Sequence, residues 1–354
     1  MQEQKGKIVA LCISEARGTV KHAVPQVKLI KDYGIEGDAH AGHWHRQVSL
    51  LSAEQVEAFN QRIAASNAQI LEKAKLATLD AKESNNIAEP GETEKAIIEP
   101  AIEGTFGENI LVSGIDLRQL PVGSTLTAGA VILKLSQIGK ECHSHCQIFH
   151  RVGDCIMPRE GVFATVEQGG ELTTGMEITV ELPNPNAPLR AAVVTLSDKG
   201  SRGERVDTAG PRAAELLAAA GYEVVEQVLL PDVQAKIERE LKRLADSRQV
   251  DLIITTGGTG MAPRDVTPEA TLAVATRSVP GIAEAIRAGS LAITKRAMLS
   301  RGVSVLRNST LIVNLPGSKK AVEEALEIVL PVLEHGIRLA KGTDGECGRT
   351  WALP

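Results

Sequence analysis

Three glycines and a carboxylate stand together in the segment TTGGTGMAPRDVTPEAT, residues 255–271. The segment follows the apolar run DLIIT, which predicts a buried strand. Glycines let backbone N–H groups approach an anion closely, and the N-terminus of the following helix adds positive partial charge. A carboxylate, Asp265, follows these glycines just before the start of the expected helix. The segment predicts a phosphate-binding loop, although the same glycines could serve only a tight strand-to-helix turn.

Two further loops follow predicted strands in the same half of the chain. One is SDKGSRGERVDTAGP, after AAVVTL, and the other is NLPGSKK, after TLIV. Because ligands of open parallel sheets bind beyond the carboxyl ends of the strands, we expect the three loops to form one site. The segments contain neither GxxxxGK[ST] nor GxGxxG, which argues against a P-loop and against the common dinucleotide-binding fingerprint.

The elements that must position these loops alternate between strand and helix. Apolar runs of strand length are separated by helical stretches such as GPRAAELLAAAG and DVQAKIERELKRLADS. This alternation implies a mostly parallel sheet covered by helices on both faces. We expect an α/β three-layer domain over residues 190–342, a proline-rich linker over 183–189, and a tail over 343–354.

The first 182 residues have a different texture. Short β-like runs such as KIVALCI and AVILKLS are separated by glycine-bearing turns, and the one long helical stretch runs from about Leu51 to Ser84. Residues 60–102 are polar and then turn-prone, which predicts an insertion. We therefore expect a β-rich domain over residues 1–182.

Composition limits the classes of partner. The chain has 354 residues, a formal net charge of −5 and 2% aromatic residues. This balance disfavours binding to a phosphate backbone or stacking on single strands, so we expect no nucleic-acid partner. No apolar run approaches the about 20 residues that span a bilayer, and the N-terminus lacks a signal-peptide pattern. Five unevenly spaced cysteines favour reduced thiols, so we predict a cytoplasmic protein without membrane contact.

The glycine-rich loops, together with LSRG, resemble those of the molybdopterin adenylyltransferase family over most of residues 190–340. The resemblance implies that the terminal phosphate of molybdopterin attacks the α-phosphate of ATP with Mg²⁺ present, which primes the cofactor for molybdate insertion. Asp265 and Asp232 match the catalytic, metal-holding aspartates of the family. The family positions that bind pterin phosphate or nucleotide are matched by Ser197, Asp198, Gly257, Gly258, Thr259, Gly260, Ser300, Arg301, Asn314, Pro316 and Gly317.

Several of these residues also have a purely structural interpretation. Asp265 could cap the helix that begins at Thr267, and Asp232 stands where the N-cap of DVQAKIEREL is expected. Arg264 and Arg301 could be exposed, solvated charges. A cap and a metal ligand are compatible roles, so the two interpretations of the aspartates stay open.

The N-terminal stretches YGIEGDAHAGHWHRQVSLLS and GTFGENILVSGIDLRQLPVGSTL, with residues 136–180, resemble a MOSC domain. The resemblance implies a β-barrel that binds a molybdopterin-type cofactor. Cys142 aligns best with the cysteine that carries sulfur or ligates molybdenum in such domains. His40 and Arg46 match the family pattern and suggest an anion-facing pocket, in which Asp38 could fix the turn.

The remaining cysteines and histidines raise a question about metal binding. The segment ECHSHCQIFHRVGDC could supply four ligands, but its spacing is not the usual C-x2-C of a zinc site. Buried thiols are the simpler interpretation of Cys146 and Cys155, and Cys12 reads as a core residue. The other candidates are His143, His145 and His150 in this segment, with His43 and His45 beside Trp44, although loop histidines beside Arg46 fit an anion-facing pocket better. The tail carries Cys347 and Trp351, and it could be a flexible terminus or bring a thiol to another site.

The sequence thus predicts a bifunctional enzyme of molybdenum cofactor biosynthesis, with molybdopterin, ATP and Mg²⁺ as ligands. The N-terminal domain would bind, sulfurate or hand over the cofactor, and fusion would raise the effective concentration of a labile intermediate. Two alternatives are a molybdopterin carrier without catalysis and a MOSC-centred molybdenum reductase of N-hydroxylated compounds. The resemblance also suggests a homotrimer, with a molybdenum insertion protein and molybdoenzymes as further partners.

Overall fold

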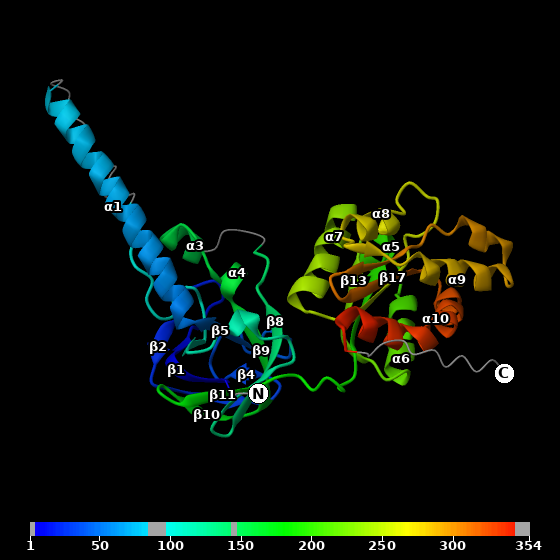
Figure 1. The fold of residues 1–354 in the computed structure, drawn as a ribbon, viewed down its shortest axis with the longest axis horizontal. Helices are drawn as coiled ribbons and strands as arrows, with labels where there is room; N and C mark the ends of the chain where they lie inside the picture. Colours follow the sequence, from blue (N-terminus) through cyan, green and yellow to red (C-terminus); the bar gives the residue numbers. More distant parts are fainter. Residues whose placement is uncertain (1–3, 84–96, 143–146, 344–354) are drawn as a thin grey trace. The chain divides into compact units, whose positions relative to one another are not determined.

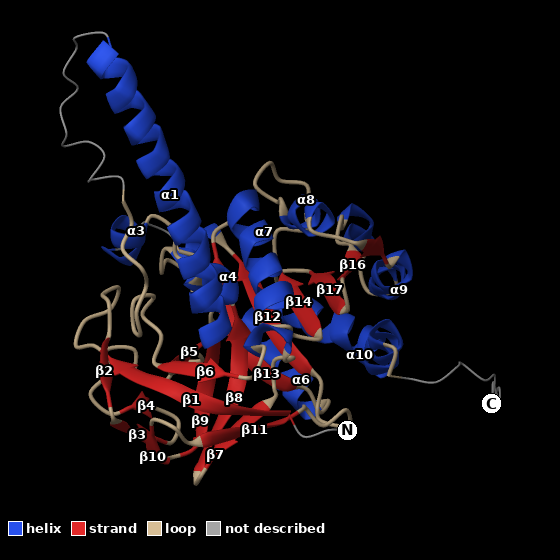
Figure 2. Cartoon of the chain, turned by 60° about the vertical axis from the view of Figure 1, so that its left-hand side comes forward, coloured by secondary structure: helices blue, strands red, loops and turns tan. Residues whose placement is uncertain are grey.

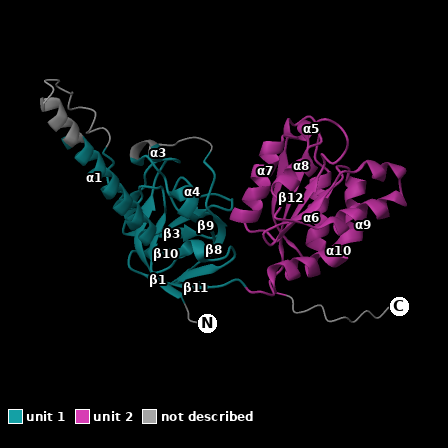
Figure 3. Cartoon of the chain, turned by 45° about the horizontal axis from the view of Figure 1, so that its top comes forward, with its two compact units in different colours: residues 1–183 teal, residues 184–354 magenta. Residues whose placement is uncertain are grey.

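The computed structural model describes residues 4–83, 97–142 and 147–343. The chain divides into two compact units, residues 1–183 and 184–354, which we call the N-terminal unit and the C-terminal unit (Figures 1 and 3). None of the helices in the described ranges is long and apolar enough to cross a membrane.

A closed antiparallel-rich sheet forms the N-terminal unit, which confirms the predicted β-barrel (Figure 2). The sheet order is β11-β7-β8-β9-β5-β6-β1-β2, and a further antiparallel pairing of β11 with β1 closes it. Strands β5 and β6 are parallel, whereas the other neighbours are antiparallel. The strands are β1 (Gln4–Ile13), β2 (His22–Val24), β5 (Val48–Ser52), β6 (Ile110–Ser113), β7 (Thr125–Ala128), β8 (Val131–Ile138), β9 (Val162–Gln168) and β11 (Glu177–Glu181).

Apolar side chains fill the barrel because successive residues of a strand point to opposite faces. In β7 the buried residues are Leu126 and Ala128, and Leu126 joins Ile8 and Leu50 in one core cluster. A smaller sheet of order β10-β3-β4 consists of β10 (Gly170–Thr173), β3 (Gln26–Ile30) and β4 (Gly34–Ile35). The short helical segments of this unit are η1 (Leu117–Gln119), α3 (Gln147–Val152) and α4 (Met157–Glu160).

The long helix α1 (Ala53–Glu83) corresponds to the predicted helical stretch and extends away from the barrel (Figures 1 and 2). Its first turns pack on the barrel, where Phe59 meets Phe106 edge-on with ring centroids 5.0 Å apart. Farther along, the side-chain amides of Asn60 and Asn67 each form two hydrogen bonds with a returning backbone segment, at Ala101 and Ile98 respectively. Of the predicted insertion, residues 84–96 lie outside the described residues.

Replacing Asn67 with alanine should release this backbone segment locally. The variant loses a bond of 2.8 Å to the Ile98 carbonyl and one of 3.1 Å from the Ile98 N–H. Each is worth about 1 kcal/mol, and the better helix propensity of alanine offsets part of the loss. We expect faster hydrogen exchange at the Ile98 amide with little change at Ala101, and no effect of Gln61→Ala on either. Unchanged Ile98 protection in Asn67→Ala would contradict the prediction.

The C-terminal unit is built on a sheet of order β13-β12-β14-β17-β16-β15. Strands β13, β12, β14 and β17 run parallel, and β16 and β15 continue the sheet in antiparallel pairings, so the predicted mostly parallel sheet is confirmed. The strands are β12 (Arg190–Leu196), β13 (Glu223–Leu230), β14 (Leu252–Thr256), β15 (Arg277–Ser278), β16 (Ser304–Arg307) and β17 (Thr310–Leu315).

Helices cover both faces of this sheet, which confirms the three-layer architecture. Val193 of β12 belongs to a core cluster with side chains of α6, α9 and α10, whereas its neighbour Val194 belongs to a second cluster under α7, η2 and α8. The helices are α5 (Asp198–Ser201), α6 (Ala209–Ala219), α7 (Gln234–Lys242), η2 (Arg243–Ser247), α8 (Thr267–Ala273), α9 (Pro280–Leu291), η3 (Lys295–Leu299) and α10 (Lys319–Lys341).

Candidate active site

The glycine loop leaves the carboxyl end of β14 in a conformation that excludes larger residues. Gly257 and Gly258 have φ of +100° and +62°. A Cβ on Gly257 would lie 2.4 Å from the carbonyl oxygen of Leu196, and one on Gly258 would lie 2.3 Å from Oγ1 of Thr267. The Thr267 hydroxyl in turn donates to the Gly257 carbonyl at 2.9 Å. The loop is therefore held close against both the end of β12 and the start of α8.

Two aspartates from neighbouring loops bind one another's backbone. The Asp198 N–H donates to Oδ2 of Asp232 at 2.9 Å, and the Asp232 N–H donates to Oδ1 of Asp198 at 3.1 Å. Arg264 adds two hydrogen bonds to the Asp198 carboxylate, of 2.9 and 2.7 Å, and these hold the pKa of Asp198 below its usual range. Arg264 is thus paired rather than only solvated, and three loops are joined through Asp198.

Asp232 and Asp265 add negative charge to the site, and among the described residues neither carboxylate has a hydrogen-bonded arginine of the kind that Asp198 has in Arg264. Burial raises the pKa of Asp232, and the charges of Asp198 and Asp265 raise it further. Asp265 accepts a hydrogen bond from the Ala262 N–H at 2.9 Å through Oδ2. Neither aspartate caps a helix, because the N-cap positions of α7 and α8 are Val233 and Val266. The capping interpretation of both residues is therefore wrong.

The donor set suits a magnesium ion that is shared with substrate. Mg²⁺ commonly takes one or two protein carboxylates and completes its octahedron with waters and substrate phosphates. Asp232 and Asp265 interact electrostatically, and a cation would relieve the unfavourable charge at Asp232. The described ranges hold no group of three or more His, Cys, Asp or Glu side chains that could bind a metal by themselves. The site fits a metal only with phosphate ligands added.

Arg301 holds the glycine loop through hydrogen bonds to its backbone carbonyls. Its N–H donates to the carbonyl of Thr259 at 2.9 Å, and its Nε donates to that of Gly260 at 2.7 Å. Its two terminal nitrogens bond to Glu269 and to the carbonyl of Asp265. The solvated-charge interpretation of Arg301 is therefore wrong, and this arginine positions the loop that carries Asp265.

Other predicted residues support the loop through contacts within the protein. Asn314 is 3% exposed, and its amide donates to the hydroxyls of Thr255 and Thr271, each at 2.9 Å. The two threonines were not among the sequence candidates. Gly317, after Pro316, lies so close that a Cβ would be 3.0 Å from the Gly257 Cα. Ser197 caps the N-terminus of α5 by accepting from the Gly200 N–H at 3.0 Å, and Ser300 forms a local turn by accepting from the Gly302 N–H at 3.4 Å.

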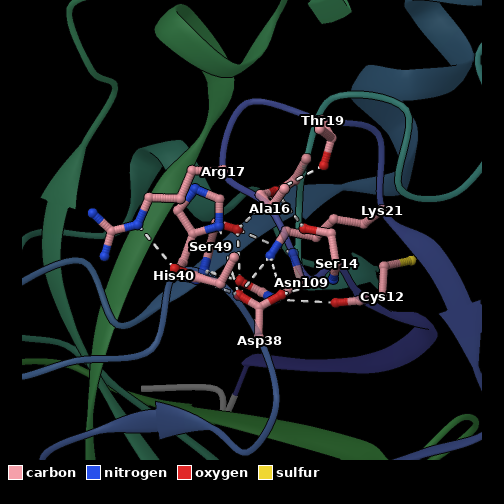
Figure 4. A network of polar contacts seen from close by, with 12 residues as sticks. Cys12, Ser14, Ala16, Arg17, Thr19, Lys21, Asp38, His40, Ser49 and Asn109 are labelled. Carbon is pink, nitrogen blue, oxygen red and sulfur yellow. Dashed lines mark hydrogen bonds and ion pairs between the residues drawn. The ribbon is translucent and has the colours of Figure 1, made fainter.

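The N-terminal unit contains a buried ion pair next to the predicted anion pocket (Figure 4). Lys21 Nζ lies 2.8 and 2.6 Å from the two carboxylate oxygens of Asp38, and both side chains have 0% exposure. Asp38 also accepts from the N–H groups of Ser14 and His40. Burial alone would raise the pKa of Asp38, but the bonds from His40 and the charge of Lys21 outweigh it, so the pKa is lowered. Lys21 was not a sequence candidate.

His40 and Arg46 lie around Trp44. The indole N–H of Trp44 donates to the His40 carbonyl at 2.8 Å, and His40 Nδ1 lies 3.6 Å from Asp38 Oδ1. The Arg46 guanidinium lies 4.8 Å from the Trp44 ring centroid and 5.7 Å from that of Phe163. The buried Asp38 therefore fixes the turn that presents His40, and Arg46 is placed by its contacts with Trp44 and Phe163.

Cys142 is exposed. Hydrogen bonds connect His45, next to Trp44, through Gln137 to Gly139, which precedes Cys142 in the sequence. His45 Nε2 lies 2.9 Å from Oε1 of Gln137, whose amide donates to the Gly139 carbonyl at 2.7 Å, three residues before Cys142. No hydrogen bond or ion pair between described residues joins Cys142 to His40 or Arg46. His143, His145, Cys146, Cys347 and Trp351 lie outside the described residues, as does the side chain of His150.

Two of the remaining cysteines and a nearby glutamate are buried in the core. Cys12 and Cys155 belong to one apolar cluster, as predicted, and burial raises the pKa of Cys12 to about 12. Glu108 has 0% exposure and accepts hydrogen bonds from the N–H groups of Gly104 and Phe106, at 2.6 and 3.1 Å. Burial raises the pKa of Glu108 to about 7, despite these two bonds.

Glu108 should make the stability of the N-terminal unit depend on pH. Its folded pKa of about 7 exceeds the ordinary 4.5, so the folded state binds more protons between these values. This stabilisation is complete below about pH 4.5 and is lost as pH rises through about 7, by about 3 kcal/mol. We expect a declining unfolding free energy from pH 5 to 8, measured by urea denaturation. If the unfolding free energy of Glu108→Gln declines with pH as steeply as that of the parent, groups other than Glu108 cause the pH dependence.

Each of the two units is similar to a known protein family. The MOSC domain family model matches residues 37–179, and the family described as "Probable molybdopterin binding domain" matches residues 192–335. The molybdopterin adenylyltransferase of Escherichia coli K12 is 46% identical over 156 residues, which cover 42% of this chain and 80% of that enzyme. The molybdopterin adenylyltransferase of Haemophilus influenzae is 46% identical over 158 residues, 44% of this chain and 79% of that enzyme.

Among solved structures, the molybdopterin biosynthesis enzyme MoaB from Thermus thermophilus is 50% identical, covers 44% of this chain and 97% of its own, and has a TM-score of 0.42. The chain is therefore a fusion of a MOSC domain with a molybdopterin-binding type of α/β domain. Through its C-terminal unit it belongs to the molybdopterin adenylyltransferase family, and its function lies in molybdenum cofactor biosynthesis.

Proposed function

We propose that the C-terminal unit transfers AMP from ATP to molybdopterin. An oxygen of the terminal phosphate of molybdopterin forms a bond to the α-phosphorus of ATP, the bond to the β-phosphate oxygen breaks, and pyrophosphate leaves. The observation that carries this proposal is the glycine loop beside Asp232 and Asp265, in a unit 46% identical to the Escherichia coli adenylyltransferase. Transfer of this kind needs positioning and charge neutralisation more than covalent help from the protein.

The residues of this chain divide that work. Gly258 to Gly260 would offer backbone N–H groups to the phosphates, while Arg301 keeps the loop in place and the Gly257 N–H donates to the Leu315 carbonyl at 3.2 Å. Asp232 and Asp265 would hold Mg²⁺, which when bound neutralises charge on the phosphates and on the departing pyrophosphate. The Arg264–Asp198 pair would keep the neighbouring loops at the distance that this arrangement requires.

We also propose that the N-terminal unit binds a molybdopterin-type cofactor through His40 and Arg46, and sulfurates it or hands it on with Cys142. The exposure of Cys142 and the fixed turn at Asp38 support this role. The protein would act in the cytoplasm, with a molybdenum insertion protein and molybdoenzymes as recipients.

A single assay tests the main proposal. Purified protein is incubated with molybdopterin, Mg²⁺ and α-labelled ATP, and the products are separated. We expect labelled adenylylated pterin together with one pyrophosphate per label. Tight pterin binding without label would favour a carrier, and molybdenum retained through Cys142 with reduction of an N-hydroxylated compound would favour the reductase.

An exposed apolar surface supports the proposed homo-oligomer. Leu291, Ile293, Met298 and Leu299 are between 41% and 64% exposed and follow one another along the end of α9 and η3. Adjacent exposed apolar side chains of this size are typical of protein contacts. Sedimentation velocity should show a trimer, and a monomer at micromolar concentration would overturn this part of the proposal.

A further inference from the structure

Arg17 lies at the Trp44 ring, as Arg46 does, but belongs to no motif that assigns it a role. It stands in the exposed loop between β1 and β2, and its Nε donates to the Ala39 carbonyl at 2.9 Å (Figure 4). This bond anchors the guanidinium at the edge of the turn formed by Asp38. Among the described residues, its two terminal nitrogens have no hydrogen-bond acceptor and no carboxylate at ion-pair distance. An anchored arginine with an open pair of donors is arranged for an external acceptor.

A second positive charge, that of Arg46, lies at the same Trp44 ring as Arg17. The guanidinium carbon of Arg17 lies 5.1 Å from the Trp44 ring centroid, and that of Arg46 lies 4.8 Å from it. Two cations at one ring repel each other, although the ring face attracts each of them. The carboxylate next to this turn, Asp38, is fully buried and already neutralised by Lys21. The positive charge of Arg17 at Trp44 is therefore available to an anion from outside.

We propose that Arg17 is a further binding residue of the site proposed at His40 and Arg46 and that its terminal nitrogens bind a phosphate group of the ligand. The planar guanidinium fork matches phosphate oxygens in pairs, which an ammonium does not. The ligand class is a phosphate-bearing molecule, either a phosphate monoester or the diphosphate that adenylylation creates. This inference rests on the proposed function of the N-terminal unit and is independent of AMP transfer by the C-terminal unit.

Trp44 provides a local signal for the test. The chain contains two tryptophans, Trp44 and Trp351, so Trp351→Phe leaves Trp44 as the single tryptophan fluorophore. This protein is titrated with inorganic phosphate and separately with pyrophosphate, at constant ionic strength. We expect a saturable change of Trp44 fluorescence with at least one anion, and the tighter one identifies the phosphate form. Arg17→Gln should weaken that binding about tenfold, the size of one charge-assisted hydrogen bond.

Two control variants separate binding from packing. Arg118→Gln removes an exposed arginine that pairs with Glu160 in the same unit, and it should bind the anion as the parent does. Arg17→Lys keeps the charge without the fork and should recover only part of the lost affinity. Equal affinity of Arg17→Gln and the parent, with matching thermal midpoints, would reduce Arg17 to a packing residue and overturn the inference.

Two further outcomes separate this inference from the proposed adenylylation. No saturable signal with either anion would overturn the inference while leaving the labelled-ATP assay unaffected. Anion binding that depends on Arg17, in a protein that forms no adenylylated pterin, would uphold the inference and overturn only the proposed transfer.

Discussion

Asp265→Asn should lower the rate of AMP transfer by about 100-fold or more, because removing one element of preorganised charge stabilisation commonly costs about 10²–10³ in rate. The asparagine oxygen can still accept the hydrogen bond from the Ala262 N–H, so the loop should keep its shape. What is lost is the negative charge that would bind Mg²⁺ together with Asp232. The variant should also need a higher Mg²⁺ concentration for half-maximal activity, measured with α-labelled ATP.

A matched variant removes the same charge elsewhere in the unit. Glu327 is an exposed residue of α10, and Glu327→Gln should leave both the rate and the Mg²⁺ requirement unchanged. Parental activity in Asp265→Asn at limiting Mg²⁺ would exclude a metal-holding role for Asp265. Asp232 would then be the remaining candidate for that role.

Gly258→Ala should destabilise the C-terminal unit by about 3 kcal/mol and abolish most activity. About 1–2 kcal/mol comes from placing a Cβ at φ of +62°. The rest comes from the contact of 2.3 Å between that Cβ and Oγ1 of Thr267, which its bond to the Gly257 carbonyl holds in place. The measurement is the urea dependence of unfolding, together with the rate of AMP transfer.

Gly221 supplies the control for backbone strain. It has φ of +91°, but a Cβ there would meet nothing within 4 Å, so Gly221→Ala should show the conformational cost without the clash. Adding Thr267→Ala to Gly258→Ala should recover part of the loss, because the two changes share one contact. If Gly258→Ala and Gly221→Ala lose the same stability, the close approach to Thr267 has no energetic consequence.

The sequence predicted the location of the C-terminal site better than its contacts. Each candidate loop follows a strongly apolar strand, and parallel strands bring such loops to one edge of a sheet, so the grouping followed from general rules. The exchange of hydrogen bonds between Asp198 and Asp232 did not follow, because it depends on how the loops after β12 and β13 end. Helix α7 begins two residues after Asp232, which removed the expected cap.

The N-terminal site shows a different limit of sequence reasoning. The GDAHAG turn was recognisable, but nothing local distinguishes Lys21 from the many lysines that stay in water. Its burial arises because the barrel brings the end of the β1–β2 loop onto Asp38, seventeen residues farther along the chain. Arg17 was missed for the same reason, since its contact with Trp44 exists only after that loop has folded.

The pairing that closes the barrel has a consequence for synthesis of the chain on the ribosome. Gln4 of the first strand lies opposite Val180 of β11, so the barrel cannot close until nearly the whole unit has emerged. Such a distant contact forms late in folding, because the chain loses the entropy of closing a long loop before the strand pairing stabilises it. Until then β1 and β7 expose strand edges that can pair with other nascent chains. A chain truncated just before β11 should therefore accumulate as aggregate rather than as a smaller barrel.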